Sequence, residues 1–260
     1  MIDINAAEKT YPNGTQALLP VDLKIHEGEF VTLLGPSGCG KTTLLNMIAG
    51  LLTPSRGSIL LWNQPADEIA SSEHRMSFVF QEATLMPWSR VAGNVRLPLD
   101  LQGVSDADAE KRVANSLALV GLSKFSNAYP RELSGGMQMR VSIARGLVTE
   151  PTLILMDEPF GALDEITRNK LDQDLLALWQ KKKLTVIFIT HSIYEAVYLS
   201  TRVVVMAARP GRVIEDVAIN EPFPRGSEFR VSTQFAQYAK HLQGSLLRAS
   251  TANELAEGAL

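Results

Sequence analysis

Cysteine is almost missing from this sequence, in which Cys39 is the single one among 260 residues. One cysteine can form neither an internal disulfide nor a multi-cysteine metal site, and a reducing compartment is its natural setting. An excess of positive charge is lacking as well, because the formal net charge is −3. A dedicated binder of DNA or RNA carries a basic field, so the composition predicts no nucleic-acid partner.

Long hydrophobic runs are lacking too. The longest are LTVIFIT (184–190) and VVVMAA (203–208), well short of the ~20 residues that a membrane helix needs. The N-terminal segment carries acidic residues where a secretory signal would carry positive charge. We therefore expect a cytoplasmic protein that serves a membrane, if at all, through a partner.

Hydrophobic residues nevertheless make up 45% of the chain, which is ample for a buried core. Short β-type runs, separated by the turn sequences YPNG and HEGE, fill the first 62 residues and predict a small N-terminal antiparallel β region. Farther on, apolar runs at 152–156 and 184–190 bracket a helical stretch from Asp164 to about Lys182. The order strand, helix, strand predicts a parallel sheet with right-handed crossovers, and hence an α/β fold.

The helical spacing of apolar residues predicts the remaining elements. One helix begins at Lys41, another covers about 105–120 and a third covers about 136–148. No internal repeat or low-complexity linker divides the sequence. We therefore predict a single domain over residues 1–260, with a helical insertion at about 84–148 and a C-terminal helical extension at about 227–248.

The stretch GPSGCGKTT, at residues 35–43, stands between a predicted strand and a predicted helix. Its glycines let backbone N–H groups turn toward phosphate oxygens, while Lys41 neutralises the β and γ phosphates and the Thr42 hydroxyl binds Mg²⁺. The sequence therefore predicts a P-loop nucleotide site with ATP and Mg²⁺ as cofactors. Cys39 lies close to a helix N-terminus, a setting that favours the thiolate and predicts a reactive thiol. The predicted nucleotide-binding residues of the loop are Gly35, Pro36, Ser37, Gly38, Cys39, Gly40, Lys41, Thr42 and Thr43.

A pair of carboxylates follows the apolar run LILM. We expect Asp157 to hold the Mg²⁺ site and Glu158 to polarise the attacking water as the catalytic base. Two acids at the end of a strand are common surface residues when they stand alone. The phosphate loop earlier in the chain favours the catalytic interpretation.

The segment LSGGMQMRVSIARGL (133–147) resembles the signature sequence of the ATP-binding cassette (ABC) ATPases. Ser134, Gly135 and Gly136 begin a predicted helix, a second N-terminus suited to an anion. The resemblance implies a head-to-tail dimer in which each ATP lies between the phosphate loop of one subunit and the signature of the other. It covers about residues 2–220 and implies a P-loop NTPase (RecA-like) parallel-sheet core with a helical insertion subdomain.

The same resemblance gives roles to further residues. It implies that Gln81 contacts Mg²⁺ and the reaction water and links the site to a membrane partner, and that His191 contacts the γ phosphate. Tyr11 matches the aromatic residue that stacks on adenine, which ring stacking makes physically plausible. Asp164 is implied at the dimer interface. Without the family, each of these residues would be an ordinary surface side chain.

Three residues depart from the family pattern. Met137 and Met139 stand where glutamine is common, so the polar contacts of those two glutamines across the dimer are not implied for this chain. Ser192 follows the histidine where aspartate is frequent, which alters a local contact at the interface.

The resemblance leaves a choice between classes of protein. The alternative to transport is a soluble ABC ATPase of DNA repair, chromosome or ribosome work. Such relatives typically carry long coiled coils, zinc cysteines or two cassettes, whereas here 93 positions separate Lys41 from Ser134 and no heptads occur. A P-loop kinase would leave the signature unexplained. The expected protein is therefore a transport ATPase.

The partners and the solute follow from the resemblance alone. It implies two transmembrane permease subunits, a second copy of the chain or a paralogue, and an extracytoplasmic solute-binding protein that acts indirectly. The ATPase would then be peripheral on the inner face of the cell membrane. FQEATLMPWSRVAGNV and DEPFGALDEITR resemble importers of nitrate, sulfonate, taurine and pyrimidine-type solutes. The solute and the identity of the partner ATPase stay open.

Overall fold

The computed structural model describes the backbone of residues 2–71 and 74–257, and the side chains of residues 2–69 and 74–248. The chain divides into two compact units, which are Met1–Glu73 with Thr185–Leu260 (the first unit) and His74–Leu184 (the second unit). The first unit is therefore discontinuous in sequence. The second unit contains the predicted insertion at 84–148 together with the strands and the helix that flank it.

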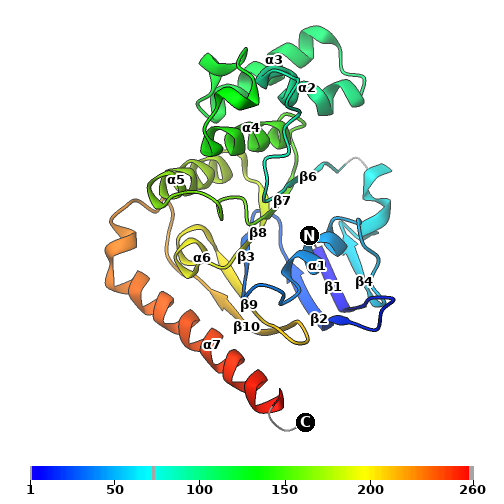
Figure 1. The fold of residues 1–260 in the computed structure, drawn as a ribbon, viewed down its shortest axis with the longest axis vertical. Helices are drawn as coiled ribbons and strands as arrows, with labels where there is room; N and C mark the ends of the chain where they lie inside the picture. Colours follow the sequence, from blue (N-terminus) through cyan, green and yellow to red (C-terminus); the bar gives the residue numbers. More distant parts are fainter. Residues whose placement is uncertain (1, 72–73, 258–260) are drawn as a thin grey trace. The chain divides into compact units, whose positions relative to one another are not determined.

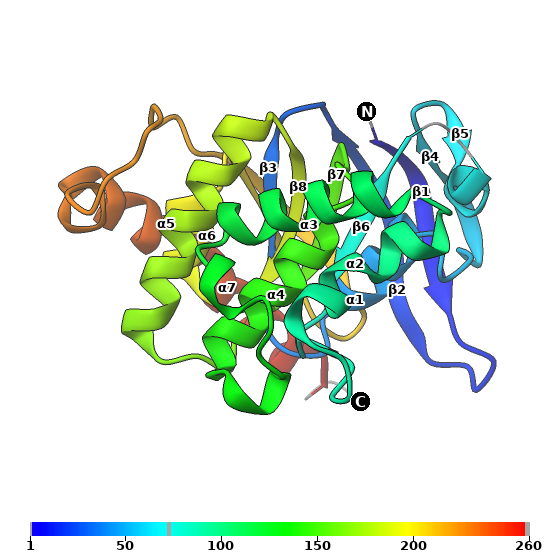
Figure 2. The ribbon, with the colours of Figure 1, turned by 90° about the horizontal axis from the view of Figure 1, so that it is seen from above.

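An antiparallel sheet forms the N-terminal part of the first unit, which confirms the prediction. Val21, Leu23 and Ile25 of its second strand are buried while Asp22 and Lys24 are exposed, the alternation expected when one face packs on the core. The strands lie side by side in Figure 2 in the order β2-β1-β4-β5. Their bounds are β1 (Ile2–Thr10), β2 (Gln16–Ile25), β4 (Arg56–Leu61) and β5 (Gln64–Pro65), followed by a 3-10 turn, η1 (Ala66–Ser71).

A second sheet of the first unit contains the parallel strands. β3 (Phe30–Leu34) runs parallel to β8 (Thr185–Thr190) on one side and to β9 (Arg202–Ala207) on the other, and β10 (Arg212–Ala218) pairs antiparallel with β9. Every residue of β3 and β8 is buried, which explains why both strands are continuous apolar runs in the sequence. The predicted α/β fold is confirmed.

The described residues of the first unit form three α-helices. α1 (Lys41–Ile48) follows β3, and α6 (Ile193–Leu199) follows β8. α7 (Thr233–Glu257), drawn in orange to red in Figure 1, packs against α6, β9 and β10. It is the expected C-terminal helix, but it begins after 227 because a separate 3-10 turn, η4 (Phe229–Val231), precedes it.

Helices dominate the second unit. They are α2 (Val91–Leu101), α3 (Asp106–Leu119), α4 (Gly135–Leu147) and α5 (Glu165–Lys182), with 3-10 turns η2 (Ser123–Phe125) and η3 (Pro130–Glu132), and the parallel strands are β6 (Met76–Val79) and β7 (Leu153–Asp157). α4 packs against α2, α3 and β6, so the helix after the signature is at the centre of this unit. Across the described residues of both units, no helix combines the length and the apolar character of a membrane span.

Candidate nucleotide-binding and catalytic site

The phosphate loop leaves the carboxyl end of β3 and leads into α1, as its sequence predicts. Gly38 and Gly40 have φ angles of 75° and 89°, in the left-handed region that favours glycine. At Gly35 crowding requires glycine, because a Cβ there would lie 2.5 Å from the carbonyl oxygen of Met206. The loop thus reaches the N-terminus of α1, where free helix amides favour an anion.

Lys41 is the first residue of α1, and only 4% of it is exposed. Its ammonium donates hydrogen bonds to the carbonyl oxygens of Gly35 at 2.8 Å and Pro36 at 3.0 Å. These bonds hold a positive charge inside the loop, where it can neutralise phosphate oxygens. Thr42, the next residue, is exposed in the first turn of the helix.

Cys39 is a buried residue of the phosphate loop. Its side chain is fully buried, with Sγ 3.9 Å from Lys41 Nζ, and this burial counts against the reactive thiol expected from the sequence. The tip of the β9–β10 hairpin packs against the same place. A Cβ on Gly211 would lie 2.5 Å from the carbonyl oxygen of Cys39 and 2.6 Å from that of Ala17. Cys39 therefore fits as a small packed side chain.

Tyr11 lies at the start of the turn between β1 and β2. Its hydroxyl is 3.4 Å from Oγ1 of Thr43, the last residue of the phosphate-loop motif, within hydrogen-bonding distance. The residue expected to stack on adenine is therefore next to the loop expected to bind the phosphates.

His191 follows the last residue of β8 and is exposed. Leu34 of β3 pairs with Thr190 of β8, so the phosphate loop and His191 leave parallel strands at the same edge of the sheet, where α/β proteins bind ligands. Ser192 caps α6, and its hydroxyl accepts a hydrogen bond from the Glu195 backbone N–H at 3.3 Å. Serine thus supplies the helix cap that aspartate would supply at this position.

Asp157 and Glu158 lie in the second unit, where β7 ends. Val79 of β6 pairs with Met156 of β7, so the chain leads to Gln81 and to the two carboxylates from the same edge of the sheet. Glu158 has a φ angle of 43°, uncommon for a residue other than glycine and frequent at functional sites. The turn that follows is closed by the Gly161 backbone N–H, which donates to the Glu158 carbonyl oxygen at 3.1 Å.

The signature residues begin α4, as the sequence predicts. Ser134 is the N-cap, and its hydroxyl accepts a hydrogen bond from the Met137 backbone N–H at 3.3 Å. Gly136 is buried, and a Cβ on it would lie 2.7 Å from the Thr167 methyl carbon. Glycine here allows α4 to approach α5 closely, while Ser134 and Gly135 are exposed.

One of the two residues that replace the usual glutamines, Met139, is buried. Met139 is 5% exposed, so an apolar side chain suits its position. The amide of Gln138 donates to the Pro130 carbonyl oxygen at 3.0 Å and so stabilises the turn before the signature.

Asp164 caps α5, and hydrogen bonds from Thr167 lower the pKa of its carboxyl below the ordinary value. This carboxylate is exposed.

The predicted residues therefore fall into two groups. The first unit holds Tyr11, the phosphate loop and His191, and the second unit holds Gln81, Asp157, Glu158, the signature and Asp164. Within each unit, strand register brings the residues that follow parallel strands to one edge.

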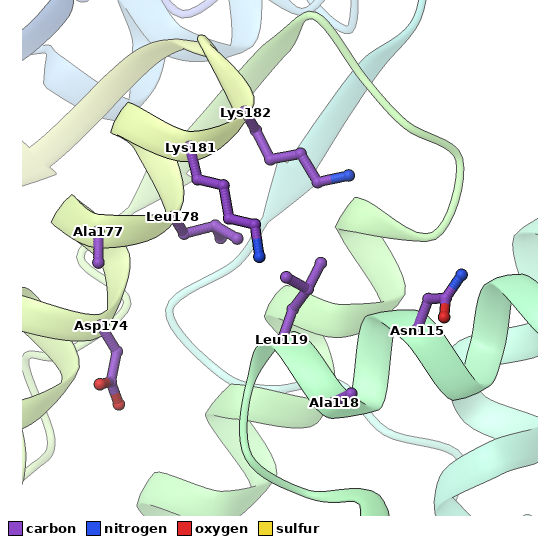
Figure 3. Close-up of a pocket in the computed structure, with 8 residues that line it drawn as sticks. All are labelled: Asn115, Ala118, Leu119, Asp174, Ala177, Leu178, Lys181 and Lys182. Atoms are coloured by element: carbon purple, nitrogen blue, oxygen red, sulfur yellow. The ribbon is translucent and has the colours of Figure 1, made fainter.

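A cavity of about 570 Å³ lies elsewhere in the second unit, between α3 and α5. Figure 3 shows Lys181 and Lys182 above Leu119, with Asp174 and Asn115 on either side. Its lining residues on α3 and α5 include none of the predicted site residues, and those on α5 reach the C-terminal end of that helix, which disfavours anions. We do not assign the nucleotide to this cavity.

The described residues contain no cluster of three or more His, Cys, Asp or Glu side chains that could hold a metal ion. They therefore offer no site that binds a metal through side chains alone. Mg²⁺ in nucleotide sites takes one or two protein oxygens and completes its shell with phosphates and water. The exposed Thr42 hydroxyl and the Asp157 carboxylate have the hard-oxygen chemistry that such an arrangement requires.

The glycine loop between β3 and α1, the carboxylates after β7 and the parallel strands define a P-loop NTPase. A family model described as "ABC transporter" matches residues 18–161. An uncharacterized ABC transporter ATP-binding protein of Methanocaldococcus jannaschii is 49% identical over 88% of this chain and 84% of its own length. The chain belongs to the ABC transporter family of ATP-binding proteins, and its activity is that of an ATPase.

Other relatives add detail. The aliphatic sulfonates import ATP-binding protein SsuB of Bacillus cereus is 39% identical over 96% of this chain and 99% of its own. Among solved structures, a dimeric ATP-binding cassette in a post-hydrolysis state with ADP and Pi has a TM-score of 0.76 and 35% identity, over 85% of this chain and all of that one. CbiO1 of Clostridium perfringens, part of an ABC transporter complex, has a TM-score of 0.78 and 27% identity, over 98% of each chain.

Two residues that sequence reasoning missed organise the loop after Gln81. Asn94, on α2, is fully buried, and Arg145, on α4, is half-buried. The available signal was a polar side chain at a helical position that periodicity assigns to the apolar face. Asn94 follows the buried Val91 and precedes Val95 on that face.

Proposed function

We propose that this chain is the ATP-hydrolysing subunit of an ABC importer and works as a pair of copies beneath separate membrane permease subunits. The observation that carries the proposal is the presence of two exposed, anion-ready helix N-termini, the phosphate loop before α1 and the signature before α4. Two such sites suit a head-to-tail dimer in which each ATP lies between the loop of one copy and the signature of the other. The dimeric cassette among the similar structures supports this arrangement.

The chemistry we propose assigns one task to each residue. Lys41 and the loop amides bind the phosphates, and Thr42 and Asp157 hold Mg²⁺, which supplies charge neutralisation at the phosphates when bound. Glu158 accepts the proton of the attacking water, and His191 orients the γ phosphate. Gln81 and Tyr11 would contact the reaction water and the adenine, respectively.

The contact with the membrane partner is proposed at residues 80–90, which we call the docking loop. It exposes Phe80 by 44% and Trp88 by 77%, two large apolar side chains on either side of Gln81 in the sequence. Aromatic residues are enriched at protein–protein interfaces relative to the rest of the surface, which favours this segment as a contact site. The occupant we propose is a cytoplasmic helix of the permease.

For the solute we propose the class that includes nitrate, sulfonates, taurine and pyrimidine-type compounds. The relatives named for import of aliphatic sulfonates support this class because they match nearly the whole chain. An ATPase subunit does not contact the solute, so the binding protein decides its identity.

The test is to purify the chain with its permease subunits and binding protein in lipid vesicles and to measure phosphate release. Candidate solutes that load the binding protein should raise the rate, and Lys41→Ala should abolish hydrolysis. A complex whose rate no candidate solute changes would contradict the importer assignment. Substantial hydrolysis by Lys41→Ala would contradict the phosphate-loop assignment.

A further inference from the structure

We propose that Arg145 fastens the docking loop to the signature helix α4, so that movement of the permease contact moves the signature. Arg145 acts here as a positioning residue and need not touch the nucleotide. The inference rests on the proposed function for its partner, but the fastening itself is a property of the second unit alone.

The contacts of Arg145 carry the inference. Its guanidinium donates to the carbonyl oxygens of Thr84 at 2.9 Å and Ala83 at 3.0 Å, and to the Thr84 hydroxyl at 2.9 Å. A fourth bond reaches the Ser142 hydroxyl on α4 itself, at 3.4 Å. One side chain of α4 therefore holds two consecutive residues of the docking loop, 61 and 62 positions away in sequence.

The backbone of Thr84 needs this support. Its φ angle is 45°, and a β-branched residue in the left-handed region is strained. Strained conformations persist where the surroundings fix them by several contacts at once. Arg145 binds both the carbonyl and the hydroxyl of Thr84, which is the kind of double contact that stabilises one such conformation.

The packing of α4 on β6 places the arginine where it can reach the loop. Gly146, the next residue, has no side chain, and a Cβ on it would lie 2.5 Å from the Ser77 hydroxyl oxygen. The helix therefore lies directly against the strand that leads into the docking loop.

Asn94 fastens the other end of the docking loop to α2. Its amide oxygen accepts from the Met86 N–H at 2.7 Å, and its amide nitrogen donates to the carbonyl oxygens of Met86 at 3.1 Å and Ser89 at 3.0 Å. Trp88 is exposed and lies in the sequence between Met86 and Ser89, the two loop residues that Asn94 binds. Because α2 packs on α4, the loop, α2 and α4 form one connected body.

Arg145 is a charged hydrogen-bond donor whose acceptors are neutral oxygen atoms. Its four hydrogen bonds go to carbonyl and hydroxyl groups, and burial lowers the pKa of its guanidinium from the ordinary value. Hydrogen bonds from a charged donor are stronger than neutral ones, so a neutral replacement should release the loop.

Hydrogen exchange tests the fastening in the full chain. Arg145→Met should speed exchange of the backbone amides in residues 82–90 about tenfold or more, while amides inside α4 stay protected. Arg140→Met is the matched control, since Arg140 is also on α4 but pairs with Asp174 at 2.8 Å. Unchanged exchange in 82–90 for Arg145→Met, or an equal increase for Arg140→Met, would overturn the proposal.

Coupling is tested in the complete complex. The isolated Arg145→Met chain should keep measurable basal hydrolysis, because Lys41, Glu158 and the phosphate loop are unchanged, whereas stimulation by the loaded transporter should be lost. Arg145→Lys, which keeps the charge but not the planar fork, should restore part of the stimulation and serves if the Met variant fails to fold. Full stimulation of Arg145→Met, or equal losses of basal and stimulated rates, would overturn the role. If the wild-type complex shows no stimulation, the importer proposal fails, and the exchange comparison still decides what Arg145 does.

Discussion

At the scale of single residues, Glu158 combines an expected catalytic carboxylate with an unusual backbone. Its φ angle of 43° and the turn closed by Gly161 hold the side chain on a fixed turn after β7. Glu158→Gln keeps the size and the backbone contacts but removes the proton acceptor. We expect hydrolysis to fall ~10²–10⁴-fold while ATP binding persists, because Lys41 and the loop are unchanged.

Phosphate release and binding of a fluorescent ATP analogue, measured on the same preparation, check this prediction. Glu158→Asp is a useful companion because it keeps the carboxylate but shortens its reach. A Gln variant as active as wild type would remove Glu158 from the role of base.

Cys39 offers a second residue-level prediction. Because its side chain is fully buried in the phosphate loop, maleimide should label the folded protein slowly and the unfolded protein completely. Mass spectrometry reads the result without ambiguity, since Cys39 is the single cysteine. Rapid labelling of the native chain would show that the loop opens far enough to expose the thiol.

At the scale of elements, one carboxylate on β10, that of Glu215, interacts with three side chains of α7. Glu215 accepts hydrogen bonds from Ser245 and from His241 at 2.7 Å, and Arg248 lies 3.9 Å away. The bond from Ser245 contributes most, and together these partners lower the pKa of Glu215 below its ordinary value of 4.5. A depressed folded-state pKa means that this stabilisation is present above pH 4.5 and is lost as pH falls through the lower folded value.

We therefore expect α7 to become more sensitive to limited proteolysis as the pH drops below about 4.5. Glu215→Gln should be more sensitive than wild type at pH 7 and should change less as the pH is lowered. Cleavage of wild-type α7 that stays constant from pH 7 down to a pH well below 4.5 would show that Glu215 does not control its docking.

The helices and strands also show which features of the fold could be predicted from the sequence. The strands at 153–157 and 185–190 and the helix predicted over about 105–120, which Ser105 caps, agree closely with prediction, because local apolar runs and capping patterns determine them. α1 ends at Ile48, although apolar spacing continues beyond it, because Gly50 turns the chain with a φ angle of 70°. Helix ends depend on such single backbone angles, which periodicity does not contain.

The sequence predicts which residue types form the site, but it does not predict the contacts that hold these residues in place. Motif spacing identifies Lys41, Glu158 and Ser134, because their chemistry demands those side chains at those positions. The burial of Cys39 depends on contacts with a hairpin about 170 positions later, and the contact of Arg145 with Thr84 spans 61 positions. Contacts of such sequence separation leave no local pattern.

At the scale of the whole molecule, the proposed dimer gives a prediction for the isolated chain. Slow hydrolysis in Glu158→Gln should trap two copies around Mg²⁺ and ATP. Size-exclusion chromatography with light scattering should then show a dimer with ATP and a monomer without it. Lys41→Ala is the control and should stay monomeric in both conditions. A Gln variant that binds ATP yet stays monomeric at high concentration would show that the pair needs the permease to form.

The discontinuity of the first unit has a consequence for synthesis on the ribosome. The phosphate loop lies within the first 43 residues, but the strands beside β3 and the hairpin tip that packs on Cys39 come from residues 185–211. The phosphate loop therefore lacks these neighbours until residues 185–211 have been translated. Nucleotide binding then becomes a late event, and a chain truncated before Gly211 lacks the surface that shapes its phosphate loop.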